Sequence, residues 1–349
     1  MLIFQTIFRS SILESLSQCE SEEERKKILD NLETSMSEFC DETAESLLRT
    51  IKTGGLSAYQ GEKRQELGGF EERLQKLWSE PLDLLELLIW LALEAGREFN
   101  YSFRKDSANA GDAVFGALIH LHARACQISS AIVVLLKSGF ADDAHARWRS
   151  LHEISVISSF ISQQGQEVAE RFLLHRAIQQ YKQVVEQRRF QGRTNEEPIS
   201  QEDFDNLRTL RDSLVDRFGS PFKEDYGWAA DAIGVARPTI WALEREVDLD
   251  HFRPCYKMAS DNIHANSHGT LHRLGKYSDQ EEVLLAGPSN AGLAGPGHST
   301  AISLCQATST LLLTRLSIDT MVDSVLLGKL AIEIGDSFLH AQQQFEAIA

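Results

Sequence analysis

Helical periodicity runs through almost the whole chain and constrains its fold more than any other feature. Apolar residues recur at spacings of three and four, and no run keeps the alternating pattern of a half-buried strand for more than a few residues. Glycines punctuate these stretches, as at Gly54-Gly55, Gly139 and Gly165. The pattern therefore predicts an all-α fold, a multi-helix bundle with an N-terminal helical extension.

The length of the chain favours more than one structural part. At 349 residues it exceeds the usual single-core domain of about 100 to 200 residues. We expect an N-terminal helical extension in residues 1–105 and the main bundle in residues 106–349. Within the extension, a charged peripheral helix is predicted to end at Gly54-Gly55, and Pro81 is predicted to open a buried helix in its first turn.

The centre of the chain predicts a helical hairpin. Residues 111–140 and 141–165 form two long helical patterns separated at Gly139, a spacing typical of antiparallel neighbours. Residues 166–190 predict a third helix, and Ser200 with Asp203 resembles a capping box for a fourth. Short connections between long helices indicate a bundle.

The C-terminal third is predicted to be less regular. A helix over HFRPCYKMASDNIHANSHG is expected to close at Gly269, and the Gly/Pro-rich residues 286–298 are expected to form a loop. Ser299 or Thr300 would then cap a final helical region, bent at Gly328 or Gly335.

Composition excludes several classes of protein. The largely apolar stretches 84–93 and 128–136 fall short of the roughly 18 to 20 residues that span a bilayer. The N-terminus lacks a basic region and cleavage site, and the five cysteines are scattered without a CxxC pair. We therefore expect a cytoplasmic protein with reduced thiols and no membrane partner. A formal charge of −16 argues against binding of duplex DNA.

Polar side chains interrupt two helices that are otherwise apolar. His120, His122 and Arg124 lie in the first helix of the hairpin, so at least one of them is predicted to be buried. The second helix carries His145, Arg149 and Glu153 along one stripe, with His152 beside it. Two interpretations stay open: an ion pair of Arg149 or Arg124 with Glu153 that fixes helix register, or a functional polar pocket inside the bundle.

Arg147 and His152 follow the spacing R-x4-H, which resembles the motif of HEPN-type ribonucleases. That resemblance implies RNA cleavage, in which the histidine assists proton transfer from the 2′-hydroxyl and the arginine stabilises the phosphorane charge. Trp148 stands where that family usually has a small polar residue.

A histidine-rich segment raises the question of a metal site. Asp261, His264, His268 and His272 would share one helical face if the helix continued past Gly269. Because Gly269 is expected to end the helix, only His264 and His268 keep the i, i+4 spacing, and two ligands do not make a site. We expect no metal and no cofactor. The loop 286–298 leads into a helix N-terminus, with His298 as the residue to consider if it acts as a lid, but it lacks the lysine of a phosphate-binding loop.

Several separated motifs resemble the bacterial family DUF5677. They are ADDAHARWRSLHEISVISSFI, AERFLLHRAI, YKMASDNIHANSHG and GPSNAGLAGPG, in that order, over about residues 110–330. Members are helical proteins of unassigned function, so the resemblance implies positions rather than an activity. Those positions are Arg149, Glu153, His175, Ser260, His264 and His268.

Together these patterns predict one interior polar pocket. We expect it to be lined by Arg149, His152, Glu153, His175, His264 and His268, and with Arg147 these are the candidate catalytic residues. The first functional hypothesis is a non-enzymatic interaction or regulatory module, a homo-oligomer with a protein partner, in which the polar cluster is structural. The alternative is a HEPN-like RNA-cleaving toxin or antiviral effector that uses Arg147 and His152 or the Arg149, Glu153 and His264 cluster.

Overall fold

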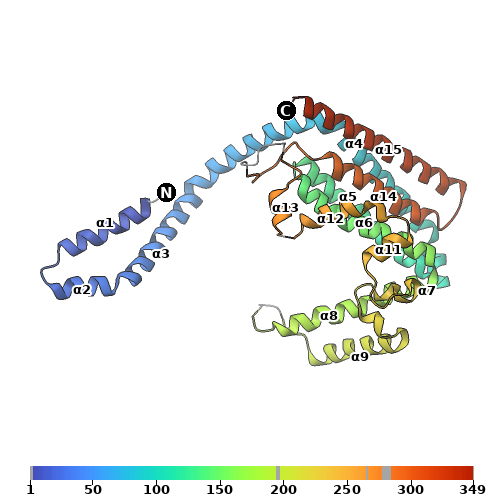
Figure 1. Cartoon of the computed structure of the whole chain (residues 1–349), viewed down its shortest axis with the longest axis horizontal. Helices are drawn as coiled ribbons and strands as arrows, with labels where there is room; N and C mark the ends of the chain where they lie inside the picture. Colours follow the sequence, from blue (N-terminus) through green and yellow to red (C-terminus); the bar gives the residue numbers. More distant parts are fainter. Residues whose placement is uncertain (1–2, 194–196, 265, 277–283, 349) are drawn as a thin grey trace. The chain divides into compact units, whose positions relative to one another are not determined.

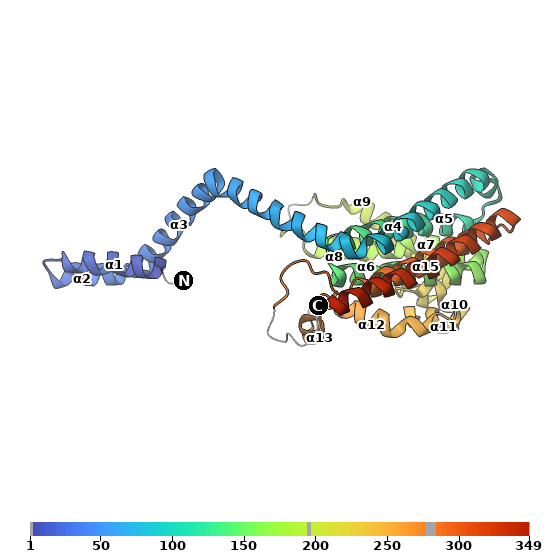
Figure 2. The same ribbon diagram turned by 90° about the horizontal axis from the view of Figure 1, so that it is seen from above.

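Every regular element in the described part of the chain is helical. The computed structural model contains no β-strand in the residues it describes, so the predicted all-α fold is confirmed. The chain divides into two compact units, unit 1 (residues 1–70) and unit 2 (residues 71–349) (Figures 1 and 2). The described residues are 3–193, 197–264, 266–276 and 284–348.

Unit 1 is built from helices that bury none of their own side chains. Ser21 begins the second of these helices with a capping box, in which its hydroxyl accepts from the Glu24 amide and the Glu24 carboxylate accepts from the Ser21 amide. The rings of Phe8 and Phe39 lie 5.1 Å apart between the first and third helices. The helices are α1 (Ile3–Ser17), α2 (Glu22–Asp30) and α3 (Leu32–Thr50).

The helical path does not end at Gly54-Gly55, so that prediction is wrong. A π-helical segment, η1 (Ile51–Gly55), joins α3 to α4 (Leu56–Ala110), and glycine weakens a helix by only about 1 kcal/mol without breaking it. Pro81 does not open a helix either. It lies inside α4 and is buried, as are Trp78, Leu82 and Leu85 of the same helix, and burial of this apolar face stabilises the helix despite the missing N–H. The domain boundary predicted between residues 105 and 106 falls inside α4.

The core of unit 2 is the predicted hairpin together with two helices from the C-terminal end of the chain. The hairpin is confirmed: α5 (Ala113–Lys137) and α6 (Ala141–Gln164) pack along each other, and Gly139 turns the chain between them with φ 76°. Both helices pack against α14 (Ala294–Leu312), which in turn packs against α15 (Ile318–Ile348) (Figure 1). Helix α6 is therefore packed between α5 and α14.

The central helix α5 has the length and composition of a membrane span. An 18-residue window within it has a mean hydropathy of 1.4, and among the described residues no other helix meets this test. The prediction from shorter apolar runs missed this because the helix contains a few polar residues. In the bundle, α5 packs against α6, α7 and α14, and buried side chains include Leu118, Ile132 and Leu136. The core helix of a folded bundle passes the same test of length and hydropathy.

His122 is the buried member of the polar group on α5, which confirms the prediction that at least one of its three residues is buried. Its Nε2 lies 3.1 Å from the Thr308 hydroxyl of α14, and it packs so closely on Gly96 of α4 that a Cβ there would lie 2.3 Å from the imidazole. Burial lowers the pKa of His122 to about 4. Arg124 donates instead to Gln127 on its own helix and does not reach Glu153.

The predicted third helix is broken at His175. The structure has α7 (Gln166–Leu174) and α8 (Arg176–Arg189), and α8 packs against α9 (Gln201–Phe218). The cap of α9 is confirmed, because the Ser200 hydroxyl accepts from the Asp203 amide at 3.0 Å. The interruption at His175 coincides with hydrogen bonds from its imidazole to the segment that follows α9.

Short helices connect α9 to the C-terminal part of the bundle. The prediction of one continuous helix that closes at Gly269 is wrong, because α12 ends at Asp261 and Asn266 caps a new helix. Gly269 lies inside that new helix, where a Cβ would approach the Asp261 carbonyl to 2.1 Å. The short elements are η2 (Ser220–Lys223), η3 (Gly227–Ala229), α10 (Ala230–Ile233), α11 (Ile240–Glu246), η4 (Asp250–Phe252), α12 (Arg253–Asp261) and α13 (Ser267–Leu271).

The C-terminal region is two helices rather than one bent helix. α14 begins at Ala294, earlier than the predicted cap at Ser299 or Thr300, so Pro296 and His298 lie in its first turns rather than in a loop. The break falls before Ile318, where the Ser317 hydroxyl accepts from the Thr320 amide. Gly328 and Gly335 both lie inside α15 without ending it, and Gly335 packs so closely on His298 that a Cβ there would lie 2.4 Å from the imidazole.

Candidate functional site

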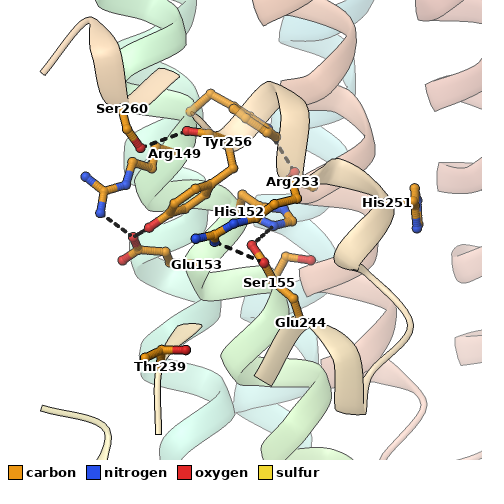
Figure 3. Close-up of polar contacts among 12 residues, drawn as sticks. Arg149, His152, Glu153, Ser155, Thr239, Glu244, His251, Arg253, Tyr256 and Ser260 are labelled. Carbon is orange, nitrogen blue, oxygen red and sulfur yellow. Dashed lines mark hydrogen bonds and ion pairs between the residues drawn. The ribbon is translucent and has the colours of Figure 1, made fainter. Parts of the chain in front are cut away.

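Helix α6 positions the candidate polar residues because it is covered on several sides. Its large apolar residues Trp148, Leu151 and Phe160 are fully buried, and α11 and α12 pack across the side of α6 that carries His152 (Figure 3). The polar residues that gather there are called the α6–α12 cluster. Its members are Arg149, His152, Glu153, Glu244, Arg253 and Tyr256.

The inner half of the α6–α12 cluster is a fully enclosed hydrogen bond between a histidine and a glutamate. The Nε2 of His152 lies 3.1 Å from Oε1 of Glu244, and both side chains are 0% exposed. Because an ionised carboxylate only accepts hydrogen bonds, Nε2 carries the hydrogen and donates it. The other carboxylate oxygen of Glu244 accepts from Arg253 at 3.1 Å. A buried carboxylate needs such partners, since an unpaired one costs several kcal/mol.

Aromatic rings enclose the imidazole of His152. The ring of Trp148 lies 5.3 Å away on the same helix, and the rings of Phe252 and Tyr256 lie 5.5 and 5.9 Å away. The Trp148 indole is itself fixed, because its N–H donates to Ser299 and Ser303 of α14 at 3.0 Å. His152 is therefore held in place and has no path to solvent within this arrangement.

The outer half of the cluster is partly open to solvent. Arg149 and Glu153 form an i, i+4 ion pair at 3.3 Å, and each side chain is 27% exposed. The Tyr256 hydroxyl donates to the same oxygen of Glu153 at 2.5 Å (Figure 3). The predicted pair of Arg149 with Glu153 thus forms, but it packs against α12 and not against the polar residues of α5.

Tyr256 joins the two halves. The guanidinium carbons of Arg149 and Arg253 each lie 4.8 Å from the centre of its ring. Burial raises the pKa of Tyr256 to about 12, with the neighbouring Glu153 carboxylate adding to the shift. Burial and the charge of Glu153 also raise the pKa of Tyr226. These phenols stay protonated near neutral pH, so they act as hydrogen-bond donors and not as bases.

His175 lies apart from the α6–α12 cluster and anchors a neighbouring segment. Its buried Nε2 lies 3.1 and 2.9 Å from the carbonyl oxygens of Phe222 and Glu224, so this nitrogen donates its hydrogen. Burial lowers the pKa of His175. The anchored segment leads directly into Tyr226, whose pKa is raised in part by the charge of Glu153. The role that the geometry gives His175 is therefore to position this segment.

The predicted histidine pair on the C-terminal side is separated from the cluster and faces outward. His264 is exposed in the turn between α12 and α13, and His268 lies in α13 with a 63% exposed side chain. His268 pairs with Asp261 at 3.2 Å and lies beside His272, with ring centres 4.6 Å apart. The expected helical i, i+4 spacing of the pair is wrong because the helix breaks between them. No group of three or more metal-ligating side chains occurs in the described parts of the chain.

The remaining predicted residues do not join the cluster. Arg147 is half-buried and makes no ion pair or hydrogen bond with the described residues. His145 is buried against Trp148, with ring centres 5.4 Å apart, and burial lowers its pKa to about 4. Ser260 donates to the Tyr256 carbonyl within α12. Of the predicted pocket residues, the structure brings together Arg149, His152 and Glu153.

Sequence reasoning missed half of the cluster. Glu244, Arg253 and Tyr256 come from segments about a hundred positions away from α6, and neither periodicity nor capping patterns place them there. One signal was present: Tyr256 opens the motif YKMASDNIHANSHG, one of those that resemble the family. A buried glutamate on a short helix, such as Glu244, carries no distinguishing pattern in a single sequence.

The region that contains the α6–α12 cluster is similar to a known protein family. Residues 115–282 match the model of a family of unknown function, DUF5677. The matched range includes α6, α11 and α12, and so every member of the α6–α12 cluster. No curated protein and no solved structure matches the chain. The similarity to the family of unknown function DUF5677 therefore covers residues 115–282, a little under half of the chain.

Proposed function

We propose that the chain is a non-enzymatic helical interaction module that assembles into homo-oligomers, with the α6–α12 cluster as a structural element. The observation that carries this proposal is the composition of unit 1. Helices α1, α2 and α3 bury no residue, yet they carry large apolar side chains such as Ile7, Met36 and Leu48, each about half exposed. Short helices gain most of their stability from covering an apolar face, so these faces need a partner.

The spacing of the exposed residues supports a helical partner. Leu29 is exposed at the end of α2, and Leu32 and Met36 are exposed four residues apart on α3, so the exposed apolar side chains continue across the junction of the two helices as a seam that a packed helix would cover. Acidic and basic side chains flank this seam, including the run Arg25-Lys26-Lys27 and the glutamates before it. Mixed charge beside an apolar seam is typical of helices that pair with their own kind.

The enclosure of His152 supports a structural role for the cluster. A catalytic base must come within hydrogen-bond distance of the proton that it removes. His152 is 0% exposed, its Nε2 faces Glu244, and its ring lies among aromatic rings. RNA cleavage by Arg147 and His152 would therefore require α6, α11 and α12 to separate first. The two residues also lie five positions apart on α6, which points them to different sides of the helix.

A pair of variants of the full chain tests the proposal. Sedimentation velocity on the native chain should give a mass above that of the 39.1 kDa monomer. The double variant Leu32→Asp/Met36→Asp places charge in the apolar seam and should lower that mass. The control Thr34→Asp/Ser37→Asp adds the same charge to exposed polar positions of α3 and should leave the mass unchanged.

Two results would contradict the proposal. One is a native chain that stays monomeric at every concentration tested. The other is cleavage of labelled RNA by the purified native chain that is lost in His152→Ala while the circular dichroism spectrum stays the same. The second result would restore the RNA-cleaving alternative.

A further inference from the structure

Helix α15 carries apolar side chains on two opposite faces. One face packs into the bundle and is buried, with Leu327, Ile334 and Phe338 fully covered. The opposite face is uncovered, and in Figure 2 α15 crosses unit 2 with no other helix in front of it. Its exposed apolar residues are called the α15 stripe. They are Ile318 (81% exposed), Met321 (54%), Val322 (58%), Val325 (58%), Ile332 (66%) and Leu339 (56%).

The spacing of the α15 stripe is regular. Ile318, Val325, Ile332 and Leu339 are each seven residues apart, so they form one line along the helix. A line of β-branched and leucine side chains about 30 Å long is much larger than the scattered apolar residues normal on a protein surface. Its length and straightness fit another helix better than they fit a small ligand.

Two opposite charges lie within this line. Lys329 and Asp336 both project on the same side of α15 as the stripe, and both are exposed. Neither makes an ion pair or a hydrogen bond with any part of the chain that the structure describes. Lys329 precedes Ile332 by three residues and Asp336 follows it by four. The charges are therefore placed almost symmetrically about Ile332.

We infer that the α15 stripe is the contact surface for the α15 helix of a second copy of this chain, packed antiparallel with the two-fold axis at Ile332. This inference rests on the proposed function and names the surface in unit 2 through which the homo-oligomer forms. In this arrangement each Lys329 lies opposite the partner's Asp336, because they stand about 4.5 and 6 Å from the axis along the helix. Val325 of one copy packs near Leu339 of the other.

The charges select this arrangement over the others. In a parallel pair, Lys329 would face a second Lys329 and Asp336 a second Asp336, which repel each other. An anionic lipid surface would meet Asp336 in the centre of the stripe and Glu333 at its side, both exposed. Only a partner with the same charges in reverse order satisfies both residues, and the antiparallel copy provides that order.

A charge swap in the full chain tests the inference. Lys329→Asp and Asp336→Lys each place like charges together and should raise the dissociation constant of the pair by about tenfold or more, as measured by sedimentation velocity. The double variant Lys329→Asp/Asp336→Lys restores opposite charges in the reversed order. Its dissociation constant should return to within about threefold of the native value.

A cysteine cross-link tests the direction of packing. In a Cys40→Ser background, which removes the exposed native cysteine, Ile332→Cys should form a disulfide-linked dimer under mild oxidation. Val325→Cys should not, because the two copies of residue 325 stand about 21 Å apart, beyond the Cα separation of about 7 Å that a disulfide spans. A parallel pair would cross-link at both positions.

The outcomes separate this inference from the proposed function. The α15 pairing is overturned if neither single charge variant changes the dissociation constant, or if cross-linking is equal through residues 325 and 332. Either result leaves the homo-oligomeric module intact. A native chain that is monomeric throughout overturns both. Recovery by the double charge variant together with selective cross-linking at residue 332 supports the pairing.

Discussion

Removal of the His152 imidazole tests the enclosed half of the α6–α12 cluster. In His152→Ala the Glu244 carboxylate, which is 0% exposed, loses the partner on its Oε1 and keeps only Arg253 on its Oε2. Removing one partner of a buried carboxylate costs up to about 3 to 5 kcal/mol. Because Arg253 remains, we expect the free energy of unfolding to fall by about 3 kcal/mol, at the lower end of that range.

The assay can be confined to the unit that contains the cluster. All five tryptophans of the chain lie in residues 71–349, so tryptophan fluorescence during urea unfolding reports on unit 2. A double-mutant cycle with His152→Ala and Glu244→Ala should give a coupling energy of about 1 to 3 kcal/mol. His251→Ala is the matched control, because His251 is exposed on η4, and it should change stability by less than about 0.5 kcal/mol. A coupling energy near zero, or equal effects of His152→Ala and His251→Ala, would refute the reasoning.

Two further predictions concern the core of unit 2. Burial lowers the pKa values of His122 and His145 to about 4, so as the pH falls below about 6.5 these histidines take up protons in the unfolded chain before they do so in the folded one. The free energy of unfolding should therefore be at its maximum above pH 6.5 and lower at pH 5 by about 2 kcal/mol per histidine. His122→Gln should reduce this pH dependence, as measured by urea unfolding. Gly96→Ala puts a methyl group 2.3 Å from the His122 imidazole and should lower the free energy of unfolding by about 1 to 3 kcal/mol. In the control Gly328→Ala, the new methyl group has nothing within 4 Å, so the variant should be more stable by up to about 1 kcal/mol. Equal thermal midpoints for the two variants would contradict the packing of α4 on α5.

Local signals in the sequence predicted local structure well. Gly139 ends α5 and Ser200 caps α9 because each effect depends on a few neighbouring residues. The errors occurred where distant contacts decide the outcome. Pro81 is tolerated inside α4 by its packing, and the helix breaks at His175, whose imidazole binds carbonyl groups some fifty residues away. No pattern near residue 175 contains that information.

The candidate site was predictable only in part for the same reason. The spacing of Arg149 and Glu153 on one helix predicts their ion pair directly, and the structure contains it. The sequence could not tell which neighbouring helix covers that face, and α12 does so rather than α5. The expected convergence of His175 and His264 with these residues does not occur. His175 donates to backbone carbonyls outside the cluster, and His264 is exposed. The catalytic roles assigned to all these residues stay predictions.

The mass of the full chain in solution tests the central claim most directly. Uncovered apolar faces on unit 1 and on α15 lead us to expect a homo-oligomer, so sedimentation velocity across a wide range of concentrations should give a mass that rises to a whole multiple of 39.1 kDa. A single species at the monomer mass, unchanged at the highest concentration, would contradict the claim that these faces serve self-association.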